Sequence, residues 1–458
     1  MGDLFNLLAF AVLNIMLIIA LFRYCSRAAD PLNRNKDVFL EGPEAFLVLL
    51  LATSTLALSA GAGGRGAGSG LNLQSIRLLF LELFLTLSFF VAKRPPRLGI
   101  GIIAYMVYMV WITISLLYTP NLNYGIRYLL KYLYPLLIML ACSAIVREEK
   151  VFLIVCIWMR RIALISTLFT IFPLVRIPLV SGLFWYSTAL NMHYVVVACA
   201  SFMMFFNYGH DWKDLAIGIL FFLPCILSVH RIGLLCIFGG SAIFFFYKFQ
   251  WASLPWIAGV VAIALFIIFN NSHWHDKMFW KDTDNSITLS TLQSGAITDE
   301  DIRDNGRKTL WSNLEQQFYD GHELTGSGIG SCQWYLYTFY AGVKQTHGDY
   351  VQMRCDTGLI GMWLYLACGI AVMLHCLVVA FGKRAPNHVK SCAIVAAGAV
   401  AGHYFSMYAD NCVTYTMATT GVSFAFYGMM LGMKSKTEET TNKAVAKDAH
   451  LILSEIAS

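Results

Sequence analysis

Arg231 is the first side chain that could do chemistry, because it stands at the junction of two apolar segments. It lies in Ser228-Val-His-Arg-Ile-Gly. A guanidinium at a membrane interface is costly and is usually paired or functional. Its planar fork can hold a phosphate by two contacts, so Arg231 is a candidate ligand for an anion. The alternative is an arginine that snorkels towards lipid headgroups.

Two more candidates lie in a polar part of the chain. Arg307 is found in Asp304-Asn-Gly-Arg-Lys-Thr-Leu-Trp-Ser, and His347 in Thr346-His-Gly-Asp-Tyr. Imidazole titrates near pH ~6.5, so His347 could take a proton from a hydroxyl group, and Asp349 could orient the ring. Taken singly, Arg307 also fits a solvated loop charge and His347 a structural histidine.

Neighbouring residues extend this set to a predicted substrate-binding group. On a helix, His347, Tyr350 and Arg354 share one face. We therefore predict that Tyr350, Arg354 and Asp349 contact substrate together with the two arginines. Arg127 follows a predicted outer turn and adds positive potential, with interfacial anchoring as the alternative.

Metal ligands and nucleic-acid contacts are weakly indicated. His273-Trp-His275-Asp276 has ligand types at tight spacing, but two nearby histidines alone are a poor metal signal. The cysteines are scattered without a CxxC pair and fit small buried hydrophobes. No run of Lys or Arg suggests a nucleic-acid partner. We predict a site with no metal and no other cofactor.

The composition defines the elements that must position these residues. Of the 458 residues, 58% are hydrophobic and only 13% are charged, whereas a soluble domain has about 25% charged residues. A water-soluble globule could not hide so much apolar surface. The apolar blocks are continuous, which excludes alternating barrel strands. The sequence therefore predicts an all-α, polytopic helical membrane protein.

The apolar blocks predict about twelve to fourteen transmembrane helices. The candidate spans are 4–22, 44–60, 72–92, 98–118, 128–146, 151–175, 190–207, 214–229, 232–247, 254–270, 355–381, 391–408 and 412–433. They divide the chain into N-terminal spans (1–270), a large loop (271–350), C-terminal spans (351–433) and a tail (434–458).

Basic residues predict the orientation of these spans. Four groups of Lys and Arg, at 23–36, 93–97, 147–150 and 383–390, fall on one side, which is therefore the cytoplasm. Arg160 and Arg161 are interpreted as the cytoplasmic end of a span. The polar tail is predicted to be cytoplasmic, and either disordered or a surface helix.

The loop at 271–350 falls on the outer side. It has eleven Asp or Glu against six Lys or Arg, so it is net acidic. It is also rich in aromatic residues, including Trp280, Trp311 and Trp334. Long loops inside a compact protein are usually functional or disordered, and this density of aromatic residues favours an ordered subdomain. We predict that it carries amphipathic helices on the membrane surface and handles a large hydrophilic substrate.

Three landmarks in this order resemble the bacterial O-antigen polymerase and O-antigen ligase superfamily, integral-membrane glycosyltransferases of the GT-C type. They are Arg231 at a span end; Arg307-x-x-x-Trp311 followed by Gly326-Ser-Gly-Ile-Gly330; and His347-x-x-Tyr350 followed by Asp356 and Gly358-Leu-Ile-Gly361. The resemblance covers about 225–375. Gly348 departs from it, because many members have Asn or Ser after the histidine.

The resemblance implies the substrate and the residue roles. Donor and acceptor would be oligosaccharides on undecaprenyl diphosphate, used at the periplasmic face of the bacterial inner membrane. Arg231 and Arg307 would bind the diphosphate and stabilise its leaving-group charge. His347 would be the general base, and direct displacement would invert the anomeric centre. Two arginines can do the charge work of a metal ion.

Polymerase and ligase share these landmarks. The His-x-Asp-Tyr form favours a polymerase of O-antigen or exopolysaccharide repeat units over a ligase that transfers glycan to the lipid A core. A transporter of polysaccharide or lipid-linked sugar is a second alternative, but transporter sites usually lie near the bilayer midplane. The sugars, the linkage and the binding of a chain-length regulator protein are left open.

Overall fold

The protein is almost entirely helical. A computed structural model of the chain describes residues 27–29, 31–32, 37–55, 81–86, 90, 95–171, 189–227, 229–279, 294, 304, 306–340 and 343–457. The helices are α2 (Gly42–Ala52), α4 (Ile100–Ile114), α5 (Leu122–Ile145), α6 (Glu149–Ile171), α8 (Ala189–Asn207), α9 (Trp212–Leu220), α10 (Leu223–Leu227), α11 (Arg231–Phe249), α12 (Leu254–Asn270), α13 (Ser272–Met278), α15 (Arg307–Phe318), α16 (Ser331–Thr338), α17 (Asp349–Phe381), α18 (Asn387–Ser406) and α19 (Thr420–Ala457). Short 3-10 turns are η1 (Thr53–Thr55), η2 (Ser115–Tyr118) and η4 (Gln250–Ser253). Strands β1 (Arg27–Ala29) and β2 (Asp37–Phe39) form one small antiparallel pair. The predicted all-α fold is confirmed.

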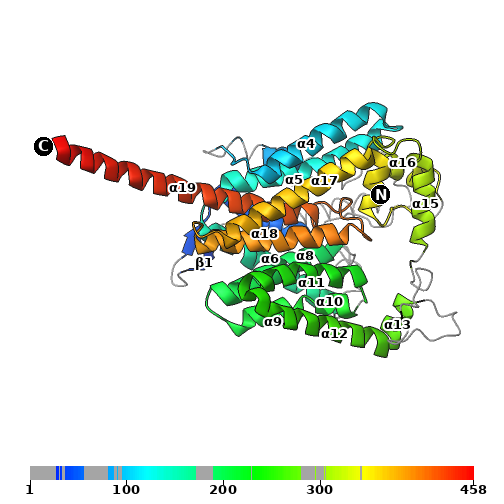
Figure 1. Cartoon of the computed structure of the whole chain (residues 1–458), viewed down its shortest axis with the longest axis horizontal. Helices are drawn as coiled ribbons and strands as arrows, with labels where there is room; N and C mark the ends of the chain where they lie inside the picture. The colour runs from blue at the N-terminus through cyan, green and yellow to red at the C-terminus, as the bar shows by residue number, and fades with distance from the viewer. Residues whose placement is uncertain are drawn as a thin grey trace, which may run out of the picture.

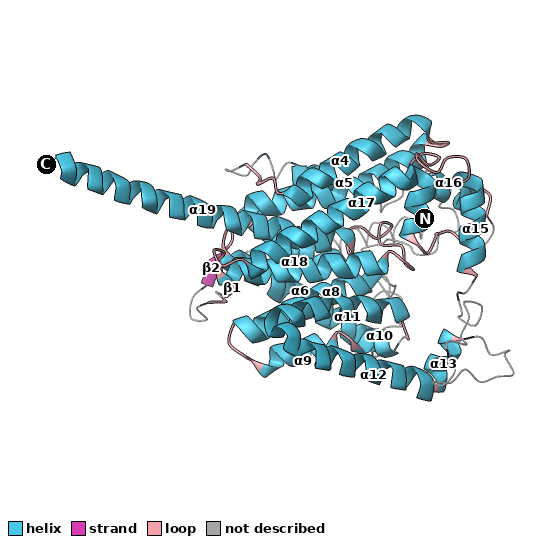
Figure 2. Ribbon diagram, in the orientation of Figure 1, coloured by secondary structure: helices cyan, strands magenta, loops and turns pink. Residues whose placement is uncertain are grey.

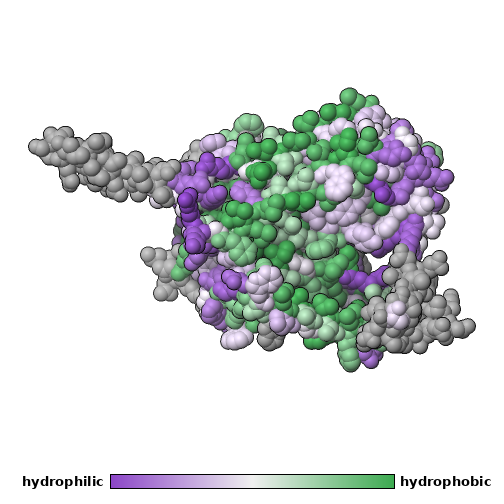
Figure 3. Space-filling model, viewed as in Figure 1, coloured by the Kyte–Doolittle hydropathy of each residue, from purple (hydrophilic) through white to green (hydrophobic). Residues whose placement is uncertain are grey.

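Five of the described helices are long and apolar enough to cross a membrane. They are Ile100–Tyr118, Leu122–Ile145, Glu149–Leu168, Arg231–Ser253 and Asp349–Phe381. The middle of the molecule is largely apolar on its surface, and polar residues gather towards both ends (Figure 3). Candidate span 4–22 and most of 72–92 lie outside the described residues, so the total number of spans stays a prediction.

Helix α4 illustrates why these segments suit a bilayer. Its buried residues include Tyr105 and Ile112, whereas Ile103, Val107 and Val110 on other faces are exposed. A helix that is apolar on every side belongs in a large core or in lipid. The outward faces of α12 and α17 are apolar in the same way, with Phe266 and Trp363 exposed. This pattern fits a molecule surrounded by lipid.

Helix α18 is at the centre of the bundle and packs against α8, α11, α17 and α19. Its side chains are mostly small, which lets neighbouring backbones approach closely. A Cβ atom on Gly240 of α11 would lie 2.8 Å from the carbonyl oxygen of Gly398 of α18. The α5–α19 contact uses the same device, because Cβ atoms on Gly428 and Gly432 would collide with carbonyl oxygens of α5 and its C-cap.

Several predicted boundaries are wrong. Candidate span 412–433 begins within an irregular turn segment at 407–419, since α19 begins only at Thr420. Candidate span 214–229 consists of two short helices, α9 and α10. Arg160 does not end a span: α6 continues through it, and its guanidinium pairs with Asp214 at 2.5 Å, so the charge is neutralised inside the bundle.

The described members of the predicted basic groups gather at one end of the molecule. Arg97 pairs with Glu438 at 2.5 Å, and Lys436 pairs with Glu148 at 2.7 Å. A cavity at this end is lined by Arg147, Lys150, Pro386 and His388 among others. The strand pair lies at the same end, where α19 leaves the bundle (Figure 2). The tail predicted at 434–458 is the continuation of α19 and is helical rather than disordered.

Helices α15 and α16 of the large loop lie at the opposite end (Figure 1). Helix α15 buries Leu310, Leu314 and Phe318, which recur every four residues and so line one face. These side chains form a second hydrophobic cluster with residues of α16 and the first turns of α17. The described part of the loop is therefore an ordered subdomain with an amphipathic helix.

Candidate functional site

The glycine-rich motif at 326–330 docks the loop onto the helix ends. Gly328 has φ 98° and Gly330 has φ 84°, a region that favours glycine. A Cβ atom on Gly328 would lie 2.6 Å from the Thr119 nitrogen, and one on Gly330 would lie 2.8 Å from the Gly125 nitrogen. Only glycine lets the loop backbone lie this close to the α4–α5 turn.

Asp356 completes this docking from within α17. Its Oδ2 accepts a hydrogen bond from the Gly330 nitrogen at 3.0 Å, and its Oδ1 accepts one from the Cys332 nitrogen at 2.9 Å. The carboxylate thus caps the start of α16. Gly358, at φ 68°, kinks α17 just below, and a side chain there would collide with the Leu324 carbonyl. These motif residues hold the loop in place.

Trp311 joins the loop helix to the turn that carries the histidine. Its Nε1 donates to the Thr346 carbonyl at 2.8 Å. Its ring covers Gly348 so closely that a Cβ atom there would lie 2.9 Å from Cζ2. Trp311 is one helical turn after Arg307, so this contact brings Arg307 to the His347 turn. A side chain at position 348 would therefore require the Trp311 ring to move.

His347 is half-buried and has a left-handed backbone, with φ 50°. A non-glycine residue in this region is uncommon, and such strain, about 1–3 kcal/mol, is often found at functional sites. Asn411 holds the residue: its Oδ1 accepts the His347 backbone N–H at 2.8 Å, and its Nδ2 lies 3.2 Å from the ring Nδ1. Asn411 belongs to the 407–419 turn segment.

Arg307 lies close enough to two histidines to act on both. Burial and then the positive charge of Arg307 lower the pKa of His347 below its usual value. Burial lowers the pKa of His230 to about 4, helped by the charges of Arg307, Lys277 and Arg231. The loop guanidinium is therefore near both the start of α11 and the turn at 345–348.

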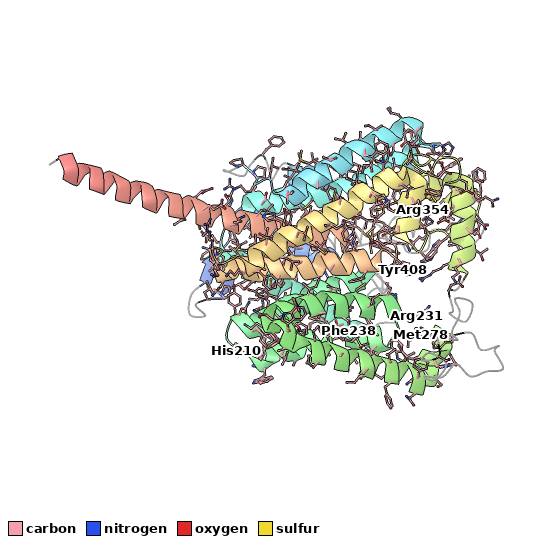
Figure 4. All side chains as sticks on the ribbon, viewed as in Figure 1. His210, Arg231, Phe238, Met278, Arg354 and Tyr408 are labelled. Atoms are coloured by element: carbon pink, nitrogen blue, oxygen red, sulfur yellow. The ribbon has the colours of Figure 1, made fainter. Side chains whose placement is uncertain are left out.

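Arg231 is the first residue of α11. Its Nη1 contacts the Met278 sulfur of α13 at 3.8 Å, and the two residues lie side by side at the loop end (Figure 4). His230 caps the helix, because its Nδ1 accepts the Gly233 N–H at 3.1 Å. Val229 just before it has φ 50°, a strained backbone for a β-branched residue. The structure thus brings together Arg231, Arg307 and His347 at one end of the molecule.

Two of the predicted substrate-binding residues, Arg354 and Tyr350, have other roles. Arg354 pairs with Glu315 and lies over the Tyr319 ring at 4.8 Å, so it ties α17 to α15. The Tyr350 hydroxyl donates to the Tyr404 carbonyl of α18 at 2.7 Å. Because His347 precedes the helix, it does not share a helical face with either residue.

Asp349 does not orient His347, which corrects the sequence-based expectation. Its side chain is only 1% exposed, and its Oδ2 accepts the Val413 N–H at 3.1 Å. The carboxylate therefore holds the 407–419 turn segment against the start of α17. Asn411, in that segment, contacts the imidazole instead. Asn411 is 64 residues from His347 along the chain, so no local motif in the sequence indicates this contact.

Arg127 lies over the Tyr124 ring at 5.3 Å, and that ring meets the Tyr337 ring at a tilt of 40°. It therefore stands where α5 meets α16. Its neighbour one turn on, Lys131, lies over the Tyr128 ring at 4.3 Å and interacts electrostatically with Asp349. Both cations add positive potential below the docked loop.

The general-base role predicted for His347 does not fit its hydrogen bonding. The backbone N–H can only donate, so the Asn411 oxygen faces it and the amide N–H₂ faces the ring Nδ1. A neutral imidazole whose Nδ1 accepts a hydrogen bond has its proton on Nε2. The open nitrogen is then a donor.

Metal ligation is untested by the described residues. Within the ranges that the structure describes, no three His, Cys, Asp or Glu side chains group to hold a metal ion. The loop also contains two Asp-x-Asp sequences, Asp282-Thr-Asp284 and Asp299-Glu-Asp301, whose carboxylates are possible metal ligands. Both lie outside the described ranges, so the predicted absence of a metal stays untested.

The comparisons with known proteins do not identify a family. No protein-family model matches the sequence, and no curated protein matches it. The function is therefore argued from the chemistry of the site.

Proposed function

We propose that this chain is an integral-membrane glycosyltransferase that polymerises oligosaccharide repeat units carried on undecaprenyl diphosphate. One observation carries the proposal: Arg307, on the loop helix α15, lies near both His347 and His230, and so adds a second guanidinium near Arg231 at the start of α11. The five membrane-length helices support a substrate that reaches the site from lipid.

The charges of this site suit a diphosphate. Arg231, Arg307 and Lys277 are the cations that act on His230. Arg231 and Arg307 are each the first residue of a helix, and helix N-termini favour anions by about 0.3–1 kcal/mol. Among the described residues, the Arg307 guanidinium has no carboxylate partner. A ligand with two negative charges would complete this cluster.

The proposed reaction is a direct displacement. The acceptor hydroxyl oxygen forms a bond to the anomeric carbon as the bond between that carbon and the diphosphate oxygen breaks. The diphosphate leaves with the electron pair, and the hydroxyl proton is released to water. Charge builds on the leaving group, where Arg231 and Arg307 would stabilise it, and the anomeric centre is inverted. Losing one such contact typically costs on the order of 100-fold in rate.

The cellular setting of this proposal is the bacterial inner membrane, with the loop end on the periplasmic side. The basic residues at the other end support this, because such residues collect in cytoplasmic loops. The product would be a surface polysaccharide such as O-antigen or exopolysaccharide. A ligase would use the same site with a lipid A core acceptor.

The test uses the purified full-length chain in detergent with a defined lipid-diphosphate-linked repeat unit. We expect higher oligomers, and we expect Arg307→Gln to slow their formation on the order of 100-fold. Lys308→Gln is the matched control, because Lys308 is the next residue on the same helix and is exposed. It should change the rate by less than about threefold, since an exposed charge is screened by solvent.

Four outcomes would count against the proposal. If the wild-type protein makes no oligomers with any acceptor, polymerisation is excluded. If it transfers glycan only to lipid A core, the protein is a ligase. Equal rates for the Arg307 and Lys308 variants would remove the arginine role. Loss of activity in EDTA, restored by a divalent cation, would show that the reaction needs a metal.

A further inference from the structure

The amide of Asn411 has its orientation dictated by the backbone. Its Oδ1 accepts the His347 N–H at 2.8 Å and lies 3.4 Å from the Thr346 hydroxyl. Its Nδ2 donates to the Gln345 Oε1 at 2.9 Å and faces the His347 Nδ1 at 3.2 Å. Turning the amide over would set oxygen against oxygen at Gln345 and leave the backbone N–H facing another donor.

This arrangement determines which ring nitrogen of His347 carries the proton. Because Asn411 donates to Nδ1, that nitrogen keeps its lone pair and Nε2 bears the hydrogen. In the described part of the chain, the Nε2 atom has no hydrogen-bond partner. The ring therefore offers the Nε2–H group to a ligand. The lone pair on Nδ1 already accepts the hydrogen bond from Asn411.

The second histidine near Arg307 is held in the same form. The Nδ1 of His230 accepts the Gly233 N–H, and a backbone amide cannot accept in return. Burial and the Arg307 charge keep the pKa of both rings low, so both are neutral near pH ~7. Neutral N–H donors beside guanidinium groups bind an anion without adding repulsion between cations.

We propose that His347 acts as a hydrogen-bond donor through Nε2 to the departing diphosphate, and that Asn411 is the positioning residue that holds it in this form. The inference rests on the proposed glycosyltransferase function for the identity of the anion. The tautomer and its dependence on Asn411 do not depend on that function.

The first experiment measures the tautomer directly. Full-length protein labelled with ¹⁵N-histidine is studied by NMR in detergent near pH 7.5, and the His347 signals are assigned by their loss in His347→Gln. We expect a protonated Nε2 and an unprotonated Nδ1. In Asn411→Asp, a carboxylate oxygen replaces the amide donor, so Nδ1 should become protonated. A protonated Nδ1 in the wild type, or an unchanged ring in Asn411→Asp, would overturn the proposal.

The second experiment distinguishes a hydrogen-bond donor from a general base at position 347. It compares two variants whose side-chain amides stand at the places of different ring nitrogens. The side-chain N–H₂ of His347→Gln stands near the Nε2 position, and that of His347→Asn near Nδ1; neither can accept a proton at neutral pH. A donor role predicts that the Gln variant keeps most of the wild-type rate, while the Asn and Ala variants lose on the order of 100-fold. A base role predicts the same loss, roughly 100- to 10,000-fold, for all three.

The pH profile gives a further readout that a purely structural role would not move. A donor still donates when protonated, so the rate should not fall as the pH drops through the pKa of His347, whereas a base would lose activity there. The charged group that acts on the ring is Arg307 on α15, whereas Asp349 on α17 and Asp410 on the turn segment act on each other. The donor role would be overturned if the wild-type rate fell with one protonation as the pH dropped and the rate of His347→Gln did not.

The two experiments fail independently. The expected tautomer without polymerase activity would reject the proposed function and leave the Asn411–His347 arrangement standing. Activity together with the opposite tautomer would reject the inference and leave the function standing.

Discussion

Arg307 differs from Arg160 and Arg354 in what surrounds its guanidinium. Arg160 is neutralised by Asp214, and Arg354 by Glu315, so both have structural roles between helices. Arg307 has no such carboxylate among the described residues. A guanidinium that acts on two neutral imidazoles without its own counter-ion is suited to a ligand that brings negative charge.

The pH dependence of anion binding should reflect the lowered pKa of both histidines. At the usual value of about 6.5, each ring would gain a positive charge as the pH fell from 8 to 6, and anion affinity would rise. Because the pKa of His347 is lowered and that of His230 is about 4, we expect nearly constant affinity over this range. The ligand used for the test is a lipid-diphosphate sugar, whose esterified phosphates keep a constant charge.

Fluorescence titration at a series of pH values measures this affinity. His347→Gln is the matched control, since it removes one titrating ring and should give the same flat profile. A rise of tenfold or so between pH 8 and 6 that His347→Gln abolishes would show that the imidazole becomes charged there, contrary to the expectation.

At the scale of elements, the loop is positioned by backbone contacts. Gly328 and Gly330 lie against the α4–α5 turn, and Asp356 accepts two N–H groups at the start of α16. Helix α15 then rests on α17 through the second hydrophobic cluster and the Arg354–Glu315 pair. The site therefore depends on a carboxylate that never meets the substrate.

Asp356→Ala should loosen the loop. The change leaves the Gly330 and Cys332 N–H groups buried without acceptors, which costs about 1–3 kcal/mol for each group. We expect a lower unfolding temperature in detergent and faster proteolysis within 306–340, together with reduced activity. Asp320→Ala is the control, because Asp320 is exposed on the same loop. Equal protease resistance of the two variants would contradict the capping role.

The whole molecule has two polar ends separated by an apolar middle. The tail end carries ion pairs between basic residues of 97–150 and acidic residues of α19 or of that same stretch, and the loop end carries the cationic site. Figure 3 shows the apolar surface between them. A bilayer around this middle would set the two ends on opposite sides.

Cysteine labelling tests that arrangement. The described cysteines are all buried, so they should react slowly with a membrane-impermeant maleimide, and Cys25 is replaced by serine. We expect Asp320→Cys to be labelled in cells whose outer membrane alone is permeabilised, and Lys383→Cys only after lysis. Both positions are exposed. Labelling of both from the same side, or the reverse order, would contradict a periplasmic site.

Much of the fold could be predicted because hydropathy is a local property. A block such as 254–270 is apolar over its whole length, and its helix has the same bounds. The same holds for the amphipathic face of α15, whose period of about four residues can be read directly. The arginine and histidine types in the loop also indicated anion chemistry before any contact was known.

The segment at 407–419 could not be predicted in this way. Its second half, 412–419, contains no charged residue, so hydropathy alone assigned that half to a helix. Its irregular path is held by contacts from elsewhere in the chain, such as the Asp349 carboxylate on the Val413 N–H. Long-range hydrogen bonds of this kind leave no periodic signal in the sequence.

The sequence by itself determined that the chain is a helical bundle with an acidic, aromatic loop, and which residues could bind an anion. Only the tertiary structure decided which partner each side chain has. Arg354 and Tyr350 connect helices, and Asn411 contacts His347. The physical reason is that the charge state and proton position of a side chain depend on its neighbours in space, which packing selects.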